Sequence, residues 1–214
     1  MINYTLTLGN LVKNFGRRVV FEGMNYSFEN GNVYGISGPN GSGKSTLVKI
    51  IANIISPTRG KVIHRLDNVN IELEKLHNHI GFVSPYLFMY DEFTAEENMI
   101  YIMNIRGKKF NKEYSDYLFN QFSLFGRKND IVRGYSSGMK QRLKYIFALI
   151  HEPELLILDE PTSNLDNSGK DKVYEIVLNE GKKNLVLIAS NDDPDLKLCK
   201  KVLFIEDFKK SSKN

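Results

Sequence analysis

A glycine-rich segment contains residues whose types and spacing fit a chemical task. VYGISGPNGSGKST places Gly38, Gly43, Lys44 and Ser45 in the pattern G-x-x-x-x-G-K-[S/T], after a strand-like run and before a run with helical periodicity. In that setting backbone N–H groups surround phosphate oxygens, the lysine reaches the β and γ phosphates, and the serine hydroxyl binds Mg²⁺. We therefore predict a site for a nucleoside triphosphate and Mg²⁺. Its residues in this segment are Gly38, Pro39, Asn40, Gly41, Ser42, Gly43, Lys44, Ser45 and Thr46.

Two adjacent carboxylates follow a second apolar run in the segment ELLILDEPTSNLD. Asp159 and Glu160 stand at the carboxyl end of a predicted buried strand, the edge at which open α/β sheets bind ligands. Asp159 would hold the Mg²⁺, and Glu160 would take a proton from the attacking water. A lone Asp-Glu pair after a strand is more typical of a solvated turn. Because the glycine-rich loop is also present, we favour the catalytic interpretation.

Small residues precede a predicted helix in the segment YSSGMKQRLKYIFALI. Ser136, Ser137 and Gly138 offer a hydroxyl cap and free backbone N–H groups, which together can bind an anion. Alone, this pattern predicts only a capped helix. Together with the two segments above, it predicts a second set of phosphate contacts.

The stretch LVLIASNDDPD puts a polar residue, Asn191, directly after a buried strand. One interpretation is a turn, because Asn and Asp tolerate left-handed backbone and Pro194 ends the hydrogen-bonded ladder. The other is that the Asn191 amide donates a hydrogen bond to a ligand. The residues leave both interpretations open.

The elements that must position these groups change in type along the chain. Strand-like runs at residues 6–12, 19–28 and 33–37 predict an antiparallel sheet near the N-terminus. A helix follows, because apolar residues recur with a period of 3.6, and SPTRG ends it. The apolar face of this helix comprises Leu47, Ile50, Ile51 and Ile54.

Residues 93–134 are mostly helical in pattern and predict an inserted helical lobe. Helices then alternate with the apolar runs LLIL, LVLIA and VLFIE, which favours a parallel sheet covered on both faces. The first helix after the lobe has an apolar face formed by Met139, Leu143, Ile146, Phe147 and Ile150.

Composition limits the possible partners and location. The 214 residues are 42% hydrophobic and 25% charged, as in ordinary soluble globular proteins. No apolar run approaches the roughly 20 residues that span a bilayer, and MINYTLTLGN lacks a secretory signal pattern, so we expect a cytoplasmic protein. The net charge of +4 is mild and spread along the chain, so we expect no nucleic-acid partner.

Four motifs in order make the whole chain resemble the nucleotide-binding subunits of ABC transporters. They are the Walker A loop GPNGSGKST, the signature YSSGM where the family usually has LSGGQ, the Walker B strand LLILDE and the D-loop SNLD. The resemblance implies one α/β P-loop NTPase domain over residues 1–214 with a mostly parallel core sheet. It also implies an N-terminal antiparallel β subdomain and a helical subdomain inserted at roughly residues 86–150.

The resemblance implies an ATPase that couples dimer closure to a separate membrane-spanning permease, on the cytoplasmic face of the cell membrane. Each of two ATP molecules would lie between one chain's Walker A loop and the other's signature, in a homodimer or heterodimer. Phe15 would stack on adenine, and Asp166 of the D-loop would be a further nucleotide-binding residue. The short length of the chain and its IGFVSPYL loop also resemble the compact subunits of haem-export and related ABC-2 exporters. The alternatives are a soluble non-transport ABC ATPase and a nucleotide-gated binding module with weak hydrolysis.

Two residues depart from the family pattern. Pro85 stands at the position of a glutamine whose amide acts as a sensor, so that function is missing or falls to Ser84 or Tyr86. Asn191 stands at the position of the switch histidine. Its amide can donate a hydrogen bond to the γ-phosphate but cannot take a proton, so we expect a neutral catalytic contact there.

An aromatic run follows Pro85 at residues 86–90. We expect it to form, with Met99 and Met103, an exposed apolar groove for a cytoplasmic helix of the permease. Core packing is the alternative explanation for these side chains.

Overall fold

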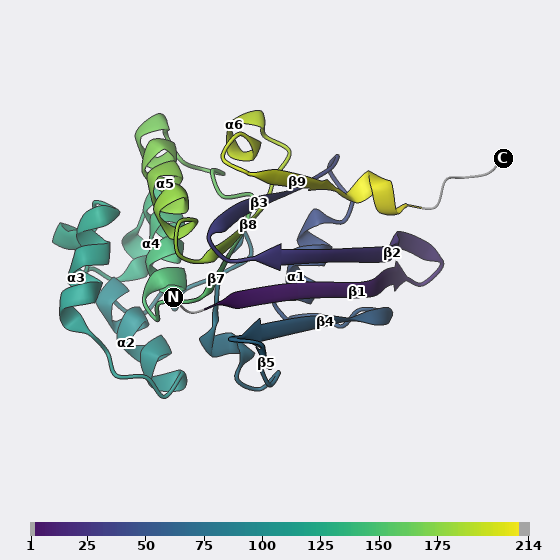
Figure 1. The fold of residues 1–214 in the computed structure, drawn as a ribbon. Coiled ribbons are helices and arrows are strands. Elements are labelled where there is room, and N and C mark those ends of the chain that lie inside the picture. The colour runs from purple at the N-terminus through teal and green to yellow at the C-terminus, as the bar shows by residue number, and fades with distance from the viewer. Residues whose placement is uncertain (1–2, 210–214) are drawn as a thin grey trace.

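The computed structural model describes residues 3–209, which form two sheets surrounded by helices (Figure 1). The four-stranded sheet is antiparallel with the order β2-β1-β4-β5, and the five-stranded sheet is parallel with the order β6-β7-β8-β3-β9. The strands are β1 (Tyr4–Phe15), β2 (Arg18–Glu29), β3 (Asn32–Ser37), β4 (Arg59–Leu66), β5 (Val69–Asn70), β6 (Ile80–Val83), β7 (Leu155–Asp159), β8 (Leu185–Ala189) and β9 (Lys201–Phe204).

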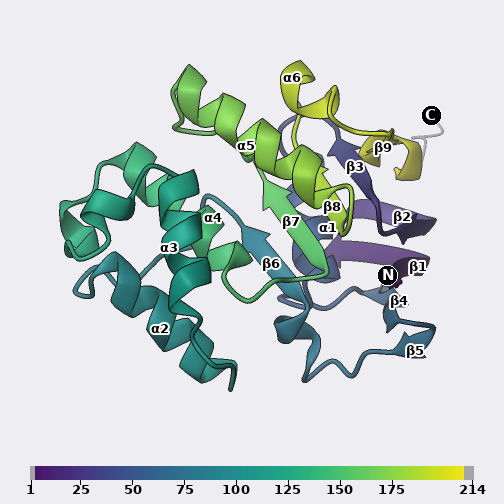
Figure 2. The ribbon, with the colours of Figure 1, turned by 60° about the vertical axis from the view of Figure 1, so that its left-hand side comes forward.

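Both faces of the parallel sheet are covered, as predicted for apolar strands that alternate with helices: one face by helices, and the other by a helix and the antiparallel sheet (Figure 2). The α-helices are α1 (Lys44–Ile51), α2 (Ala95–Ile105), α3 (Lys112–Gln121), α4 (Ser137–Leu149), α5 (Asn167–Glu180) and α6 (Asp193–Leu196). Short 3-10 turns lie at Leu76–Asn78, Phe125–Arg127, Val132–Gly134 and Ile205–Phe208. Within the described residues, none of these helices has the length and apolar content to cross a bilayer.

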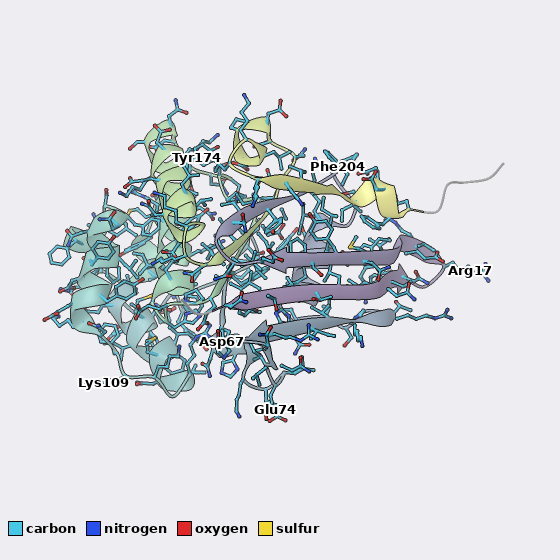
Figure 3. All side chains as sticks on the ribbon, viewed as in Figure 1. Arg17, Asp67, Glu74, Lys109, Tyr174 and Phe204 are labelled. Carbon is cyan, nitrogen blue, oxygen red and sulfur yellow. The ribbon has the colours of Figure 1, made fainter. Side chains whose placement is uncertain are left out.

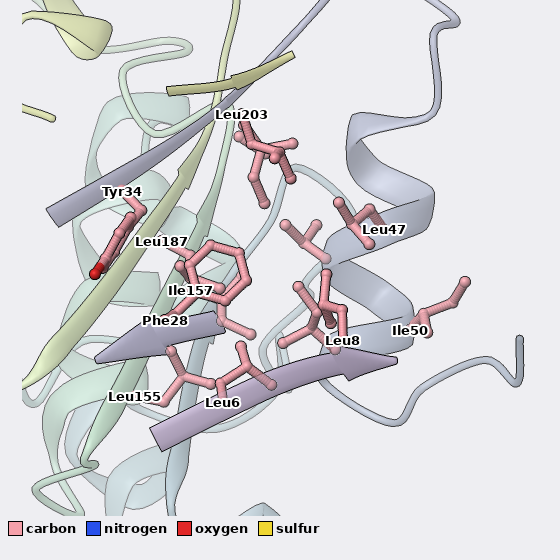
Figure 4. Packing of buried hydrophobic residues seen from close by; sticks show 14 of the residues in the cluster. Leu6, Leu8, Phe28, Tyr34, Leu47, Ile50, Leu155, Ile157, Leu187 and Leu203 are labelled. Atoms are coloured by element: carbon pink, nitrogen blue, oxygen red, sulfur yellow. The ribbon is translucent and has the colours of Figure 1, made fainter. Parts of the chain in front are cut away.

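One hydrophobic core lies between the two sheets and includes α1 (Figure 4). Leu6 of β1 pairs with Phe28 of β2, and both side chains are fully buried against the parallel sheet. Leu47 on α1 enters the same core. The glycine-rich loop therefore precedes a helix that is held by apolar contacts from two directions.

A second core lies on the other face of the parallel sheet, where α4 and α5 pack. Alternate residues of β7 enter the two cores: Leu155 and Ile157 the first, Leu156 and Leu158 the second. This division explains why the strand is apolar along its whole length.

Helices α2, α3 and α4 group at one end of the molecule, and the β1–β2 hairpin, with Arg17 at its tip, lies at the other end (Figure 3). Thr94 begins α2 with a capping box, in which its hydroxyl accepts the Glu97 N–H and the Glu97 carboxylate accepts the Thr94 N–H. The expected subdomain boundary at residues 86–150 stays a prediction.

Three expectations about elements were wrong. Residues 33–37 belong to the parallel sheet, and the third long strand of the antiparallel sheet is β4, whose sequence RGKVIHRL has little apolar alternation. Ile54 lies beyond the end of α1 and is exposed, because the helix ends at Ile51. Met99 and Met103 are buried in the core around α2 and α4, so they line no exposed groove.

Gly81 of β6 provides a test of how closely the parallel sheet packs against α4. A Cβ at Gly81 would lie 2.2 Å from the Ala148 carbonyl oxygen and 2.9 Å from Pro153 Cγ. We expect Gly81→Ala to reduce the free energy of unfolding by about 1–3 kcal/mol through overpacking. Urea unfolding measures the change, with Gly126→Ala as the control because nothing lies within 4 Å of a Cβ there. Equal unfolding midpoints for both variants would contradict this packing argument.

Candidate active site

A pocket of about 230 Å³ lies beside the turn that joins β3 to α1. It brings together residues from three separate parts of the chain: the β1–β2 hairpin, the glycine-rich loop and the end of β7. The residues that line it are Phe15, Arg18, Val20, Asn40, Gly41, Ser42, Gly43, Lys44, Ser45, Thr46 and Glu160.

The glycine-rich loop contains a position that only glycine can occupy without a steric clash. Gly43 has φ 118°, and a Cβ there would lie 2.3 Å from Val20 Cγ1. Gly43 is also the N-cap of α1, with no side-chain cap and no acidic residue in the first turn. The first N–H groups of α1 are therefore left to an anion, as a phosphate site requires.

Lys44 lies across the base of the loop. Its ammonium nitrogen donates a hydrogen bond of 2.7 Å to the Gly38 carbonyl oxygen and lies 3.8 Å from Glu160 Oε1. The side chain is almost fully buried, so its charge is weakly screened. The positive charge expected to bind phosphate is thus held at the loop by contacts within the chain.

Ser45 and Asp159 form the candidate magnesium site. The Ser45 hydroxyl donates a 2.9 Å hydrogen bond to Asp159 Oδ1, and the buried Oδ2 has no hydrogen-bond partner among the described residues. Burial raises the pKa of Asp159, whereas the Ser45 hydrogen bond and the charges of Lys49 and Lys44 oppose the rise. A hydroxyl beside a carboxylate oxygen without a partner is a suitable donor set for Mg²⁺.

Glu160 lies at the pocket wall in a strained conformation. Its φ is 51°, in the left-handed region that residues other than glycine rarely adopt. Its N–H donates to the Ala189 carbonyl oxygen at 2.9 Å. Partial burial raises the pKa of Glu160, and the nearby Lys44 charge opposes that rise. A raised pKa suits a carboxylate that must accept a proton.

The family model described as ABC transporter matches residues 21–163, a range that contains the loop, both carboxylates and the start of α4. The chain belongs to the ABC transporter family. It is 32% identical over 179 residues to the linearmycin resistance ATP-binding protein LnrL of Bacillus subtilis, covering 80% of this chain and 56% of LnrL. It is 33% identical over 187 residues to the lantibiotic transport ATP-binding protein SrtF of Streptococcus pyogenes, covering 87% and 79%.

The fold is also that of a bacterial ABC transporter cassette solved as a dimer. The TM-score is 0.80 at 24% identity, and 93% of each chain is covered. This chain spans little more than half the length of LnrL.

Several predicted site residues do not line this pocket: Gly38, Pro39, Ser136, Ser137, Gly138, Asp159, Asp166 and Asn191. Ser136 caps α4 by accepting the Met139 N–H, and Ser137 and Gly138 begin that helix. Asp166 caps α5, and its Oδ1 accepts the Gly169 N–H at 2.8 Å. These residues do not line the pocket of their own chain, so their predicted contacts with ATP stay predictions.

The two departures from the family pattern have different surroundings. Asn191 is exposed, and its side chain makes no hydrogen bond to the described residues, so both interpretations of it stay open. The segment with Pro85 is bound on two sides: Lys144 Nζ donates to the Ser84 and Pro85 carbonyl oxygens at 3.0 Å, and Lys49 Nζ lies 4.7 Å from the centre of the Tyr86 ring. The sequence did not single out Lys144, because its contacts are to backbone some 60 residues away.

The buried charge of Asp159 leads to a stability prediction. Burial raises the pKa of Asp159 in the folded chain above its value in the unfolded chain. Above the folded pKa the ionised carboxylate therefore lowers the free energy of unfolding, and this cost decreases as the pH falls through the folded pKa toward the unfolded one. We therefore expect Asp159→Asn to raise Tm at neutral pH, by about 2–4 °C for each kcal/mol of stabilisation. Thermal unfolding of the nucleotide-free chain measures this, with the exposed Asp171→Asn as control. A Tm below that of the unchanged chain would contradict the expected burial cost.

Proposed function

We propose that this chain is the ATP-hydrolysing subunit of an ABC transporter. The observation that carries the proposal is that one pocket is lined by the Lys44 loop, by Ser45, whose hydroxyl contacts Asp159, and by Glu160. The family supports binding of ATP. The protein would couple hydrolysis to a separate membrane-spanning permease.

The residues of the pocket fit ATP with Mg²⁺. Phosphate oxygens would accept hydrogen bonds from the first N–H groups of α1 and from Lys44. Phe15 is half exposed and lines the pocket, with Lys13 Nζ 4.7 Å from the centre of its ring, and this ring would stack on adenine. Ser45 and Asp159 would hold Mg²⁺, which when bound neutralises the charge of the β and γ phosphates.

Hydrolysis needs a base for the attacking water, and we assign that part to Glu160. The water oxygen bonds to the γ-phosphorus, the bond from that phosphorus to the β–γ bridging oxygen breaks, and Glu160 accepts the water proton. Lys44, 3.8 Å from the Glu160 carboxylate, would stabilise negative charge on the transferred group. ADP and inorganic phosphate leave.

A second chain would complete the site. Ser136, Ser137 and Gly138 present a helix N-terminus outside the pocket of their own chain, and Asp166 also lies apart from it. Assembly head to tail would bring the signature of one chain to the nucleotide of the other, as a homodimer or as a heterodimer with a related subunit. The cassette of the same fold that was solved as a dimer supports this arrangement.

The segment after Pro85 is the surface we assign to the permease. Tyr86, Phe88 and Tyr90 are all more than half exposed, and Tyr90 packs edge-on against Tyr101 with ring centroids 5.2 Å apart. Exposed apolar patches of this kind mark interaction sites. The protein would thus lie peripherally on the cytoplasmic face of the membrane, and the relatives named for resistance and lantibiotic transport favour an exporter.

A second candidate function is a nucleotide-gated module that closes on ATP but hydrolyses it weakly. Pro85 and Asn191 favour it, because Pro85 has no side-chain amide to act as a sensor and Asn191 cannot take a proton or carry charge. Steady phosphate release by the purified chain would exclude it.

The two charged residues of the pocket should be separable by mutation. Lys44→Ala removes charge-assisted hydrogen bonds to phosphate and should weaken ATP binding by about 10- to 100-fold or more. Glu160→Gln should retain ATP binding, trap a closed dimer, and lower hydrolysis by about 10²- to 10⁴-fold. Titration with ATP, gel filtration and phosphate release measure these effects, and Glu175→Gln, at an exposed side chain of α5, is the control. Parent-like hydrolysis by Glu160→Gln would mean that another group is the base.

Asn191 should act as a neutral donor to the γ-phosphate. Losing one hydrogen bond to a charged group costs roughly 1.5–3 kcal/mol, so Asn191→Ala should slow turnover about 10- to 100-fold. Asn191→His should add a pH dependence near the histidine reference pKa of about 6.5, which the unchanged chain lacks. Single-turnover hydrolysis across that pH range measures both effects. An unchanged rate for Asn191→Ala would leave Asn191 with the turn interpretation only.

A further inference from the structure

A buried carboxylate outside the pocket is surrounded by hydroxyl groups. Asp195 of α6 is 1% exposed, and its Oδ2 accepts a 2.7 Å hydrogen bond from the Ser190 hydroxyl. Its Oδ1 accepts hydrogen bonds from Tyr174 at 2.9 Å and Thr162 at 3.3 Å. We call these four residues the Asp195 cluster; Tyr174, on α5, is labelled in Figure 3.

Stability alone does not account for this carboxylate. Among residues 3–209, no lysine or arginine forms an ion pair with Asp195, and the side-chain partners of its carboxylate are the hydroxyl groups of Thr162, Tyr174 and Ser190. A buried anion without a cation costs more than an apolar side chain of similar size. Burial and the hydrogen bond to Asp195 raise the pKa of Tyr174 to about 12, which keeps the phenol protonated as a donor.

One partner of Asp195 fixes the backbone around Asn191. Ser190 directly precedes Asn191, and its hydroxyl also accepts the Asp192 N–H at 3.1 Å. The Ser190 N–H donates to the Ile36 carbonyl oxygen of β3 at 3.1 Å. The N–H groups of Ser190 and Asp192, the residues before and after Asn191, are therefore held.

Another partner fixes the segment that carries Glu160. Thr162 lies two residues after Glu160, and the intervening Pro161 carbonyl oxygen accepts the Tyr145 hydroxyl at 2.6 Å and the Gln141 amide at 3.3 Å. Helix α4 thus holds this segment from one side, and Asp195 holds it from the other through Thr162. This support stabilises the left-handed backbone at Glu160.

We propose that Asp195 is a positioning residue that sets the distance between Glu160 and Asn191. The inference rests on the proposed ATPase function, in which Glu160 accepts the water proton and Asn191 contacts the γ-phosphate. Asp195 does not line the ATP pocket. It acts through Thr162 on one loop and through Ser190 on the other.

The central test is Asp195→Asn, which keeps the size of the side chain but loses one acceptor and the charge. We expect kcat to fall about 10- to 100-fold while KM for ATP stays within about twofold, because positioning acts on the reaction and not on ATP affinity. Thr162→Val should lower kcat in the same way, and Thr162→Ser, which keeps the hydroxyl, should restore it. Asp193→Asn, an exposed aspartate of the same helix, is the matched control.

Two further comparisons separate positioning from general stability. Ser190→Ala combined with Asp195→Asn should be no slower than Asp195→Asn alone, because both changes break the same contact. Tyr174→Phe removes the Tyr174 hydroxyl on α5. It should lower Tm, and it should lower kcat less than Asp195→Asn does. Parent-like kcat for Asp195→Asn, or for both Thr162→Val and Ser190→Ala, would overturn the inference.

Hydrogen exchange tests the same contacts without hydrolysis. Asp195→Asn should speed amide exchange in residues 160–163 and 190–192, and Asp193→Asn should not. Absence of hydrolysis by the unchanged chain would contradict the proposed function. Unchanged exchange in both segments of Asp195→Asn would contradict the positioning role, whether or not the chain hydrolyses ATP.

Discussion

The order and register of three parallel strands is the constraint on which the site depends. Strands β7, β8 and β3 are neighbours, and Ala189 of β8 lies in register with Asp159 on one side and Ile36 on the other. Their carboxyl ends therefore place Asp159, Asn191 and the start of the glycine-rich loop at one edge of the sheet. None of these groups is close to another in sequence.

The same edge concentrates features that cost stability. Asp159 is a buried carboxylate, Glu160 has left-handed backbone, and Asp195 is a buried carboxylate that forms no ion pair with any residue from 3 to 209. Two hydrophobic cores on opposite faces of the sheet offset these costs, because the strands contribute apolar side chains to both. Strain and unpaired polar atoms are typical of sites whose geometry serves binding rather than stability.

The local motifs could be predicted from sequence because each carries its chemistry in consecutive residues. The parallel sheet was also predictable, since LLIL and LVLIA are apolar throughout and alternate with helices. The placement of β3 and the existence of β4 were not, because pairing partners are distant and the β4 sequence has no clear alternation. Nothing in the sequence singled out Asp195 or Lys144, because each is a charged residue among other polar residues. Their distinguishing features are burial and contacts with segments that are distant in the sequence, and these are visible only in the structure.

Support through backbone explains how the family's glutamine position can hold a proline. Lys144 contacts the carbonyl oxygens of Ser84 and Pro85, and every residue type has a carbonyl group. Proline loses an N–H donor but no acceptor, so this contact between α4 and the segment after β6 survives the substitution. The Asp195 cluster holds the Asn191 turn in a similar way, because it binds Ser190 and not the side chain of residue 191. The contacts that hold the Pro85 segment and the Asn191 segment therefore do not involve the side chains of Pro85 and Asn191, the two residues that differ from the family pattern. These two side chains can change without loss of the contacts that position the backbone.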